Sequence, residues 1–301
     1  MGSRILVTGA LGQIGTELVE ALEEKYGQGS VIATDVREGN NCRILDVMDA
    51  AGIESLVRDE SITEIYHLAA LLSATGEKNP ELCWKINVEG LENVIAAANT
   101  HGCRVFAPSS IAVFGPDCPS IAPQVTPLNP TTVYGKTKVV SEQLAMTTGV
   151  DMRGLRYPGL ISYKAPAGGG TTDYAVEIFH AALTEGHYTC FVREDTRLPM
   201  MYMDDAIRAT LELMEVPSEQ LGGARGGYNI SGCSFTAGEL VASIQRHLPD
   251  FTCAYEPDIR QNYADSWPND IDDEVARSEW GWVPEFDLDG MVDAMFAGLQ
   301  A

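Results

Sequence analysis

The sequence predicts an α/β protein in which a doubly wound parallel sheet is followed by a smaller α/β lobe. In the first half, short apolar runs alternate with longer segments of helical spacing, which is typical of parallel strands buried on both faces. After Gly159 this alternation stops, and helices and strand fragments follow at irregular intervals. We therefore expect a sheet domain over residues 1–159 and a smaller lobe over 160–301, some of whose elements return to the sheet.

The elements of the first half follow from the period of their apolar residues. Over 13–26, Ile14, Leu18 and Leu22 share one helical face, and glutamates occupy the opposite face. Both long helices of this half end at a glycine, which readily adopts the left-handed conformation of a helix stop. The expected helices are 13–26, 50–58, 81–100 and 131–148, and the expected strands are 4–8, 31–34, 42–45, 64–68, 104–107 and 152–157.

The second half is predicted to be richer in loops. A loop over 165–172 contains three consecutive glycines at 168–170. The expected helices are 173–184, 204–215, 237–248, 273–280 and 288–299, and the expected strand fragments are 189–192, 227–230 and 253–255.

The charge of the chain excludes two classes of partner. Its 301 residues hold 20 Lys and Arg against 43 Asp and Glu, a formal net charge of −23 at pH 7. A surface this acidic repels phosphate backbones and anionic lipids, so we expect neither a nucleic acid nor a membrane partner. No apolar stretch reaches about 18 residues, so no transmembrane helix is expected.

The N-terminus and the cysteines indicate where the protein works. The chain enters its first apolar strand within four residues of Met1, which leaves no room for a leader peptide. Its seven cysteines are scattered and form no C-x-x-C pair, so we expect neither a disulfide framework nor a metal site. These features predict a cytoplasmic protein with reduced thiols and no bound metal.

A glycine-rich turn joins the first strand to the first helix. Gly9, Gly12 and Gly15 give the spacing G-x-x-G-x-x-G, which permits a tight turn, a close backbone approach to a pyrophosphate and close helix–strand packing. The N-terminus of the helix then faces the negative charge. The turn predicts a dinucleotide site, with Leu11, Gln13 and Ile14 as its other contacts.

An acidic residue ends the second strand. Asp35 lies twenty residues beyond Gly15, where a carboxylate accepts hydrogen bonds from the adenosine ribose and repels a 2′-phosphate, so NAD is favoured over NADP. Arg37 is a further expected cofactor contact that favours NADP, but we expect Asp35 to dominate because it stands at the strand terminus. Asp46 and Val47 follow the third strand, where a loop can touch adenine.

Three residues form the predicted catalytic group. Tyr134 and Lys138 lie four residues apart at the start of a helix and therefore share a face. An unperturbed tyrosine has a pKa of about 10, and a neighbouring ammonium group lowers it, so Tyr134 can serve as a general base. Ser110 follows the fifth strand, at the end where ligands of parallel sheets bind, and its hydroxyl can contact both a substrate oxygen and Tyr134.

These motifs follow the order found in the extended short-chain dehydrogenase/reductases, which the chain resembles over almost its whole length. The order is the glycine turn, Asp35, residues 67–70, Asn87, Ser110 followed by Val113-Phe114-Gly115, Tyr134 with Lys138, and residues 156–159. The resemblance implies a Rossmann-type fold, NAD as cofactor and a small-molecule substrate. It also favours Ser110 over Ser109, because the family pattern places the serine five residues before Gly115.

The resemblance further implies cofactor contacts and an assembly. Lys138 is expected to bind the nicotinamide ribose, and the cofactor is expected to be lined by Leu68, Ala69, Ala70, Asn87, Tyr134, Lys138, Tyr157, Pro158, Gly159 and Leu160. Helices 81–100 and 131–148 are expected to pack as a four-helix bundle in a homodimer.

One branch of the family, the short-chain-type L-threonine 3-dehydrogenases, resembles the chain most. The similarity rests on residues 67–73, 155–161, 168–174, 197–201 and 265–268, and on 280–282. It implies NAD-dependent oxidation of the 3-hydroxyl of L-threonine to 2-amino-3-oxobutyrate, with Tyr134 as base. The expected substrate contacts are Ser73, Ser110, Tyr134, Thr171, Thr172 and Trp267.

Two other functions remain open at this point. A nucleotide-sugar epimerase or dehydratase of the same superfamily shares Ser110, Tyr134 and Lys138. Such enzymes usually carry an asparagine where this chain has Gly159, and they need basic residues for a diphosphate, of which residues 250–301 offer only two. A non-catalytic NAD sensor on the same fold is the second alternative, and loss of the tyrosine or the lysine would mark it.

Overall fold

The computed structural model describes residues 3–166 and 168–301. Residues 1–2, which belong to the N-terminus discussed above, lie outside the described residues. Residue 167, within the expected 165–172 loop, also lies outside them. Among the residues described, no helix combines the length and the apolar character that a membrane crossing requires.

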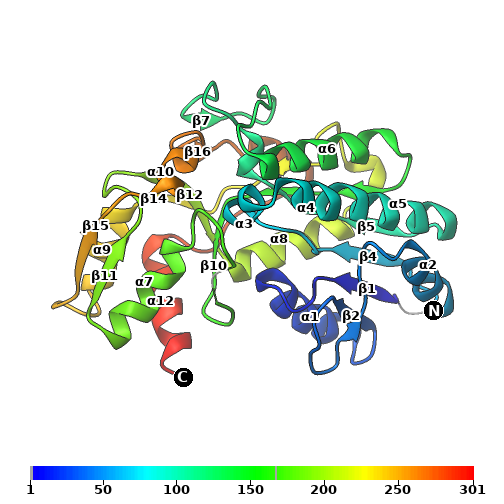
Figure 1. The fold of residues 1–301 in the computed structure, drawn as a ribbon, viewed down its shortest axis with the longest axis horizontal. Coiled ribbons are helices and arrows are strands. Elements are labelled where there is room, and N and C mark those ends of the chain that lie inside the picture. The colour runs from blue at the N-terminus through cyan, green and yellow to red at the C-terminus, as the bar shows by residue number, and fades with distance from the viewer. Residues whose placement is uncertain (1–2, 167) are drawn as a thin grey trace.

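A six-stranded parallel sheet forms the centre of the molecule (Figure 1). Its strand order is β3-β2-β1-β4-β5-β8, so the chain starts in the middle, moves to one edge and then returns to build the other. The predicted doubly wound, Rossmann-type fold is confirmed. The strands are β1 (Ile5–Thr8), β2 (Val31–Asp35), β3 (Arg43–Ile44), β4 (Glu64–His67), β5 (Arg104–Phe106) and β8 (Met152–Arg153).

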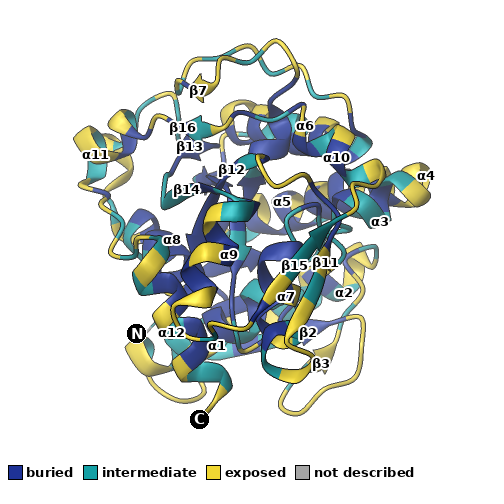
Figure 2. Ribbon diagram, turned by 90° about the vertical axis from the view of Figure 1, so that its left-hand side faces the viewer, coloured by how far each residue is buried: buried dark blue, intermediate teal, exposed yellow. Residues whose placement is uncertain are grey.

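Helices cover both faces of this sheet because alternate strand residues point to opposite sides. Leu6 and Val105 belong to a core that contains the helices α2 (Ala50–Asp59) and α5 (Gly90–His101). Ile5, Val7 and Phe106 face a second core that contains α1 (Gln13–Tyr26) and α8 (Met203–Glu215). Figure 2 shows the result on the helices, whose inward faces are buried and whose outer faces are exposed.

The expected strand over 152–157 is divided in the structure. It breaks at Gly154, where an added Cβ would lie 2.5 Å from the Gly226 carbonyl oxygen and 2.7 Å from that of Ala107. After this break β9 (Leu155–Tyr157) leaves the central sheet and pairs with β6 (Ser109–Ser110) and β13 (Tyr228–Asn229). The predicted single strand is therefore wrong, and the bend carries Ser110 and Tyr157 toward the same side of the molecule.

The expected helix over 81–100 is also divided. It consists of α4 (Pro80–Trp84), a π-helical turn over Lys85–Glu89, and α5. The π-helical turn contains Asn87, and such turns are frequent at functional sites. A further helix, α3 (Ser73–Lys78), precedes it and was not predicted, because six residues that include a glycine carry no helical period. The helix α6 (Val133–Thr147) packs against both α3 and α4.

The remaining elements build the second lobe and connect it to the sheet. Its core contains Phe179, Phe235 and Phe296. The strands β10 (Gly159–Ile161), β12 (Arg197–Tyr202) and β14 (Cys233–Thr236) form one sheet, while β11 (His187–Cys190) pairs with β15 (Thr252–Tyr255) and β7 (Ile121–Ala122) with β16 (Asp270–Ile271). The other helices are α7 (Tyr174–Thr184), α9 (Ala237–Gln245), α10 (Ile259–Ala264), α11 (Glu274–Trp280) and α12 (Leu288–Leu299), with 3₁₀ turns at Ile111–Val113 and Ser218–Gln220.

Candidate active site

The glycine turn has the geometry that a pyrophosphate requires. Gly9 has a φ of +71°, and a Cβ there would lie 2.7 Å from the Ala69 amide nitrogen. A Cβ on Gly15 would lie 2.7 Å from the Cα of Ala10. Gly12 is the N-cap of α1, so no side chain caps the helix, and its first turn contains no acidic residue. The amide groups at this helix end are therefore free of side-chain caps and face outward as an anion site, which fits a dinucleotide.

Asp35 lies beside this turn at the end of β2. Its carboxylate accepts hydrogen bonds from the Leu11 amide at 3.1 Å and from the Arg37 amide at 3.0 Å, and it forms an ion pair with the Arg37 guanidinium. Burial raises the pKa of Asp35, but these hydrogen bonds outweigh it and leave the pKa below its usual value. The structure thus places an ionised carboxylate where the adenosine ribose is expected and pairs Arg37 with it.

The other predicted contacts near the adenosine end are arranged as follows. Asp46 accepts a hydrogen bond from the Met48 amide at 2.9 Å. The Val47 side chain is buried, and its carbonyl accepts from Asn93 at 3.0 Å. Both residues therefore belong to the turn that follows β3.

Two further segments complete the wall of the expected cofactor site. Ala69 touches Gly9 of the glycine turn, as described above, and Ala70 follows it. The Gln13 side chain donates to the Leu160 carbonyl at 3.4 Å, which connects the turn to β10. The Tyr157 side chain instead lies in the core against α8, where its hydroxyl contacts Thr210. Of the expected cofactor residues Tyr157, Pro158 and Gly159, Tyr157 can therefore face the cofactor only with its backbone.

Ser110, Tyr134 and Lys138 lie together. The Ser110 side chain lies close enough to the Tyr134 phenol to lower its pKa, and its Oγ accepts from the Ala112 amide at 3.2 Å. The Lys138 Nζ lies 5.6 Å from the centre of the Tyr134 ring. Lys138 donates to the Pro108 carbonyl at 2.8 Å. Ser109 differs from its neighbour, because its hydroxyl donates to Glu142 at 2.5 Å.

Burial controls the pKa values of this group. It raises the pKa of Tyr134 to about 12, with the Ser110 hydrogen bond acting in the opposite direction. It lowers the pKa of Lys138 to about 8. Both shifts oppose charge separation, so a phenolate at Tyr134 needs positive charge from outside the chain as well as from Lys138.

Asn87 connects three parts of the site. Its side chain accepts from the Leu71 amide at 2.8 Å and donates to the Leu71 carbonyl at 3.0 Å. It also donates to Thr137 of α6 at 3.2 Å. It also contacts the Cys83 sulfur of α4 at 3.5 Å. The donors and the acceptor of the Asn87 amide are therefore bonded within the chain, to Leu71, α4 and α6.

The predicted substrate residues make contacts with one another and with the segments around Tyr134. Ser73 and Thr171 are both buried, and their hydroxyls are 3.3 Å apart. A Cβ on Gly159 would lie 2.8 Å from Thr172, so the 168–172 segment touches the expected nicotinamide wall. Trp267 packs on the cluster that contains Tyr134. The structure therefore brings together residues from five distant parts of the sequence.

Sequence reasoning missed one polar residue at this site. Glu77 accepts hydrogen bonds from the amides of Val133 and Tyr134. It lies on α3, which was not predicted. A signal for it was absent because its partners are backbone groups more than fifty residues away.

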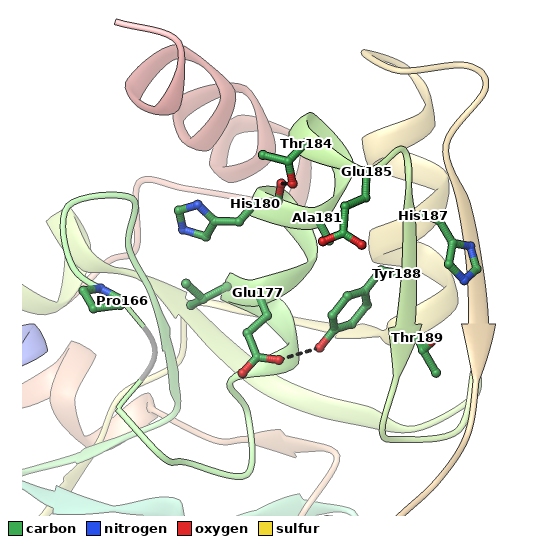
Figure 3. A pocket seen from close by; sticks show the side chains of 10 residues that line it. Pro166, Glu177, His180, Ala181, Thr184, Glu185, His187, Tyr188 and Thr189 are labelled. Atoms are coloured by element: carbon green, nitrogen blue, oxygen red, sulfur yellow. Dashed lines mark hydrogen bonds between the residues drawn. The ribbon is translucent and has the colours of Figure 1, made fainter.

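A separate surface pocket of about 670 Å³ lies between α7 and β11 (Figure 3). His180, Glu185 and His187 line it, and Tyr188 donates to Glu177 at 2.8 Å. None of the predicted catalytic or cofactor residues lines this pocket. Within residues 3–166 and 168–301, no group of three or more His, Cys, Asp or Glu side chains is arranged to hold a metal ion.

Comparison with known proteins identifies the family. Residues 5–231 match the NAD dependent epimerase/dehydratase family. The chain belongs to this family. The resemblance to the extended short-chain dehydrogenase/reductases is thereby confirmed, and NAD is the cofactor.

Similar proteins and structures are known. An uncharacterized epimerase/dehydratase of Staphylococcus aureus strain USA300 is 47% identical over 99% of this chain and 97% of its own length. The structure of a monomeric L-threonine 3-dehydrogenase from a metagenome database is 52% identical, covers 98% of both chains and superposes with a TM-score of 0.95.

One enzyme, the GalE-like L-threonine dehydrogenase from Cupriavidus necator, offers two forms for comparison. Its holo form superposes with a TM-score of 0.95 at 50% identity, over 98% of this chain and 99% of that one. Its apo form gives 0.86 at 47% identity, over 99% of both chains. The present structure is therefore more similar to the holo form.

Proposed function

We propose that this chain oxidises the 3-hydroxyl of L-threonine to a ketone, giving 2-amino-3-oxobutyrate. The observation that carries the proposal is the wall beside Tyr134. Trp267 packs on the Tyr134 cluster, and the helix α3, which packs against α6, carries Ser73, whose buried hydroxyl contacts that of Thr171. This wall offers uncharged hydrogen-bonding groups and an aromatic ring, which suit a small zwitterion rather than a large anionic substrate. The L-threonine dehydrogenases of similar structure support the same reaction.

The three catalytic residues divide the work. When bound, NAD⁺ supplies the hydride acceptor and a positive charge beside the phenol. Tyr134 takes the proton of the substrate hydroxyl, and the hydrogen on the same carbon leaves with its electron pair. Ser110 donates a hydrogen bond to the substrate oxygen and holds it next to the phenol. Lys138 lowers the pKa of Tyr134 and binds the nicotinamide ribose.

The 168–172 segment closes the site over the substrate. A Cβ on Gly168 would lie 2.9 Å from the Leu72 side chain, and one on Gly169 would lie 2.7 Å from the Thr75 hydroxyl, so the segment lies directly on α3. This arrangement supports a closed conformation. Closure excludes water during proton transfer, and Thr171 and Thr172 contact the substrate only in this state.

A nucleotide-sugar substrate is disfavoured by the charges of the second lobe. Residues 160–301 contain 24 Asp and Glu but only eight Lys and Arg. Seven of these cations, all within the described residues, are paired with carboxylates: Lys164, Arg193, Arg197, Arg208, Arg246, Arg260 and Arg277. The eighth, Arg225, donates to the Ala145 carbonyl. Apart from Arg225, every cation of this lobe would therefore have to leave an existing ion pair before it could bind a diphosphate.

A non-catalytic NAD sensor is the remaining alternative. The close arrangement of Ser110, Tyr134 and Lys138 argues against it, since a sensor has no use for a buried base beside a donor.

The expected homodimer in the cytoplasm stays a prediction. The helices proposed for the interface expose Trp84 and Met146, which are 41% and 47% accessible. A similar protein is described as monomeric. Light scattering after size exclusion distinguishes the two states, and a single-chain mass would contradict the dimer.

The proposed function is tested by absorbance at 340 nm with purified protein and L-threonine. We expect NADH to form with NAD⁺ but no NADPH to form with NADP⁺, because Asp35 repels a 2′-phosphate. A chain that binds NAD⁺ but produces no NADH from threonine contradicts the proposal. UDP-sugars and dTDP-sugars are then the substrates to screen, and their conversion would establish the epimerase alternative.

A further inference from the structure

The helix α3 packs against both α4 and the start of α6. A Cβ on Gly76 would lie 2.7 Å from the Cys83 sulfur of α4, so a glycine permits this close approach, and it would lie in ordinary contact, at 3.9 Å, with the Tyr134 Cβ of α6. Cys83 and Tyr134 belong to the same buried cluster. The spacing between the substrate side of the site and the base is therefore set where these helices meet.

Glu77 forms the polar part of this contact. Its Oε1 accepts from the Val133 amide at 2.6 Å and from the Tyr134 amide at 3.4 Å. These are the first two amides of α6, which have no partner within the helix. The third, that of Gly135, donates to the N-cap residue Thr132 at 3.0 Å. A carboxylate is also favoured at this position by the helix dipole.

The carbonyl of Tyr134 is connected by hydrogen bonds to the segment that precedes α3. It accepts from the Thr137 hydroxyl at 2.7 Å, and Thr137 in turn accepts from Asn87. Asn87 forms two hydrogen bonds with Leu71, just before α3. Both peptide groups of the base are thus connected to residues 71–78.

The same segment carries the substrate side of the site. Ser73 contacts Thr171, and Thr75 lies against Gly169. A shift of α3 relative to α6 would therefore move the substrate-binding hydroxyls relative to the phenol. Misplacement of this kind by about 1 Å can cost roughly 100-fold in rate.

We propose that Glu77 is a positioning residue that sets the distance between the substrate-binding segment 71–78 and the base Tyr134. This inference rests on the proposed oxidation of L-threonine. Glu77 acts as a hydrogen-bond acceptor of defined reach, and its charge is secondary. It contacts neither the glycine turn nor Asp35, so its effect is confined to substrate turnover.

The test compares three substitutions with a matched control. Glu77→Ala removes the side-chain oxygen that accepts the two hydrogen bonds. Glu77→Asp shortens the side chain by one methylene, and Glu77→Gln keeps an accepting oxygen without the charge. Glu81→Ala removes an exposed carboxylate from the neighbouring α4. We expect kcat/KM for threonine to fall about 10- to 100-fold in the alanine variant and by less in the aspartate variant. Glutamine and the control should stay within about twofold of the wild type, and the NAD⁺ dissociation constant should not change.

Hydrogen exchange supplies a readout that does not depend on turnover. In Glu77→Ala, the amides of Val133 and Tyr134 should exchange faster, while those of β1 and α1 keep their protection. If the alanine variant does not fold, the aspartate and glutamine variants carry the same comparison.

The outcomes separate this inference from the proposed function. If the wild-type protein leaves threonine unchanged, the proposed function is overturned, and so is the positioning role of Glu77 in that reaction, whatever the exchange data show. Active wild type with an unaffected alanine variant overturns only the inference. A glutamine variant as impaired as alanine, or a parallel loss of NAD⁺ affinity, also overturns it, because charge or general stability would then explain the effect.

Discussion

The cofactor side and the substrate side of this site are built in different ways. The adenosine and pyrophosphate end of the cofactor side is local, since the glycine turn and Asp35 lie within the first 35 residues, and the turn presents mainly backbone amides. The substrate side joins Ser73, Tyr134, Thr171 and Trp267, which are spread over about two thirds of the chain. A shared cofactor can therefore be recognised from spacing, whereas the substrate depends on how distant segments meet.

The largest expected effect comes from removing the base, which should abolish most of the turnover and leave cofactor binding intact. Tyr134→Phe should lower kcat for threonine oxidation by about 10²–10⁴-fold, because no other group takes the hydroxyl proton. NAD⁺ affinity, measured by fluorescence titration, should stay unchanged. Tyr255→Phe, in the distant β15, is the matched control. A kcat close to that of wild type would assign the base to another residue.

A substitution in the glycine turn should instead weaken NAD⁺ binding. Gly15→Ala places a methyl group 2.7 Å from the Ala10 Cα, so the turn must move. The expected cost is about 1–3 kcal/mol, measured as weaker NAD⁺ binding and a lower Tm. Gly223→Ala is the control, because its Cβ would meet nothing within 4 Å. Equal NAD⁺ affinity in both variants would show that the turn does not hold the cofactor.

The pH dependence of turnover tests the electrostatics of the base. The pKa of Tyr134 is raised to about 12 by burial, so the phenolate fraction grows with pH throughout the neutral and alkaline range. We expect kcat/KM to rise by up to about tenfold per pH unit from pH 7 to 8 and to level off above pH 8, because the pKa of Lys138 is about 8 and its charge is lost there. Lys138→Met should move this rise to higher pH, while Lys136→Met, at an exposed position of the same helix, should not. A profile that is flat in the wild type contradicts this assignment.

The smallest expected effect concerns the uneven charge of the two parts. Residues 1–159 hold 19 acidic against 12 basic residues, whereas residues 160–301 hold 24 against eight. Salt screens repulsion between exposed charges, so Tm should rise by a few degrees, roughly, between 0.05 M and 1 M NaCl. Hydrogen exchange should slow more in 160–301 than in 1–159. A Tm that falls with salt would show that the surface ion pairs outweigh the repulsion.

The sequence by itself determined the central sheet and the cofactor turn of this protein. Apolar periodicity located all six strands of the sheet to within a few residues, because the strands other than the exposed edge strand β3 are largely buried on both faces. The spacing of Gly9, Gly12 and Gly15 marked the turn, because backbone approach to a phosphate requires glycine at defined steps. These are short-range patterns, and they need no knowledge of the rest of the fold.

Only the tertiary structure decided how the substrate side is assembled. The break at Gly154 depends on Gly226, seventy-two residues away, and no local pattern announces it. The contact of Glu77 with Tyr134 likewise has no sequence pattern that predicts it, since the partner of Glu77 is a backbone amide that every residue except proline possesses. Side chains that recognise backbone groups leave no residue pair to detect, and the fold alone brings them together.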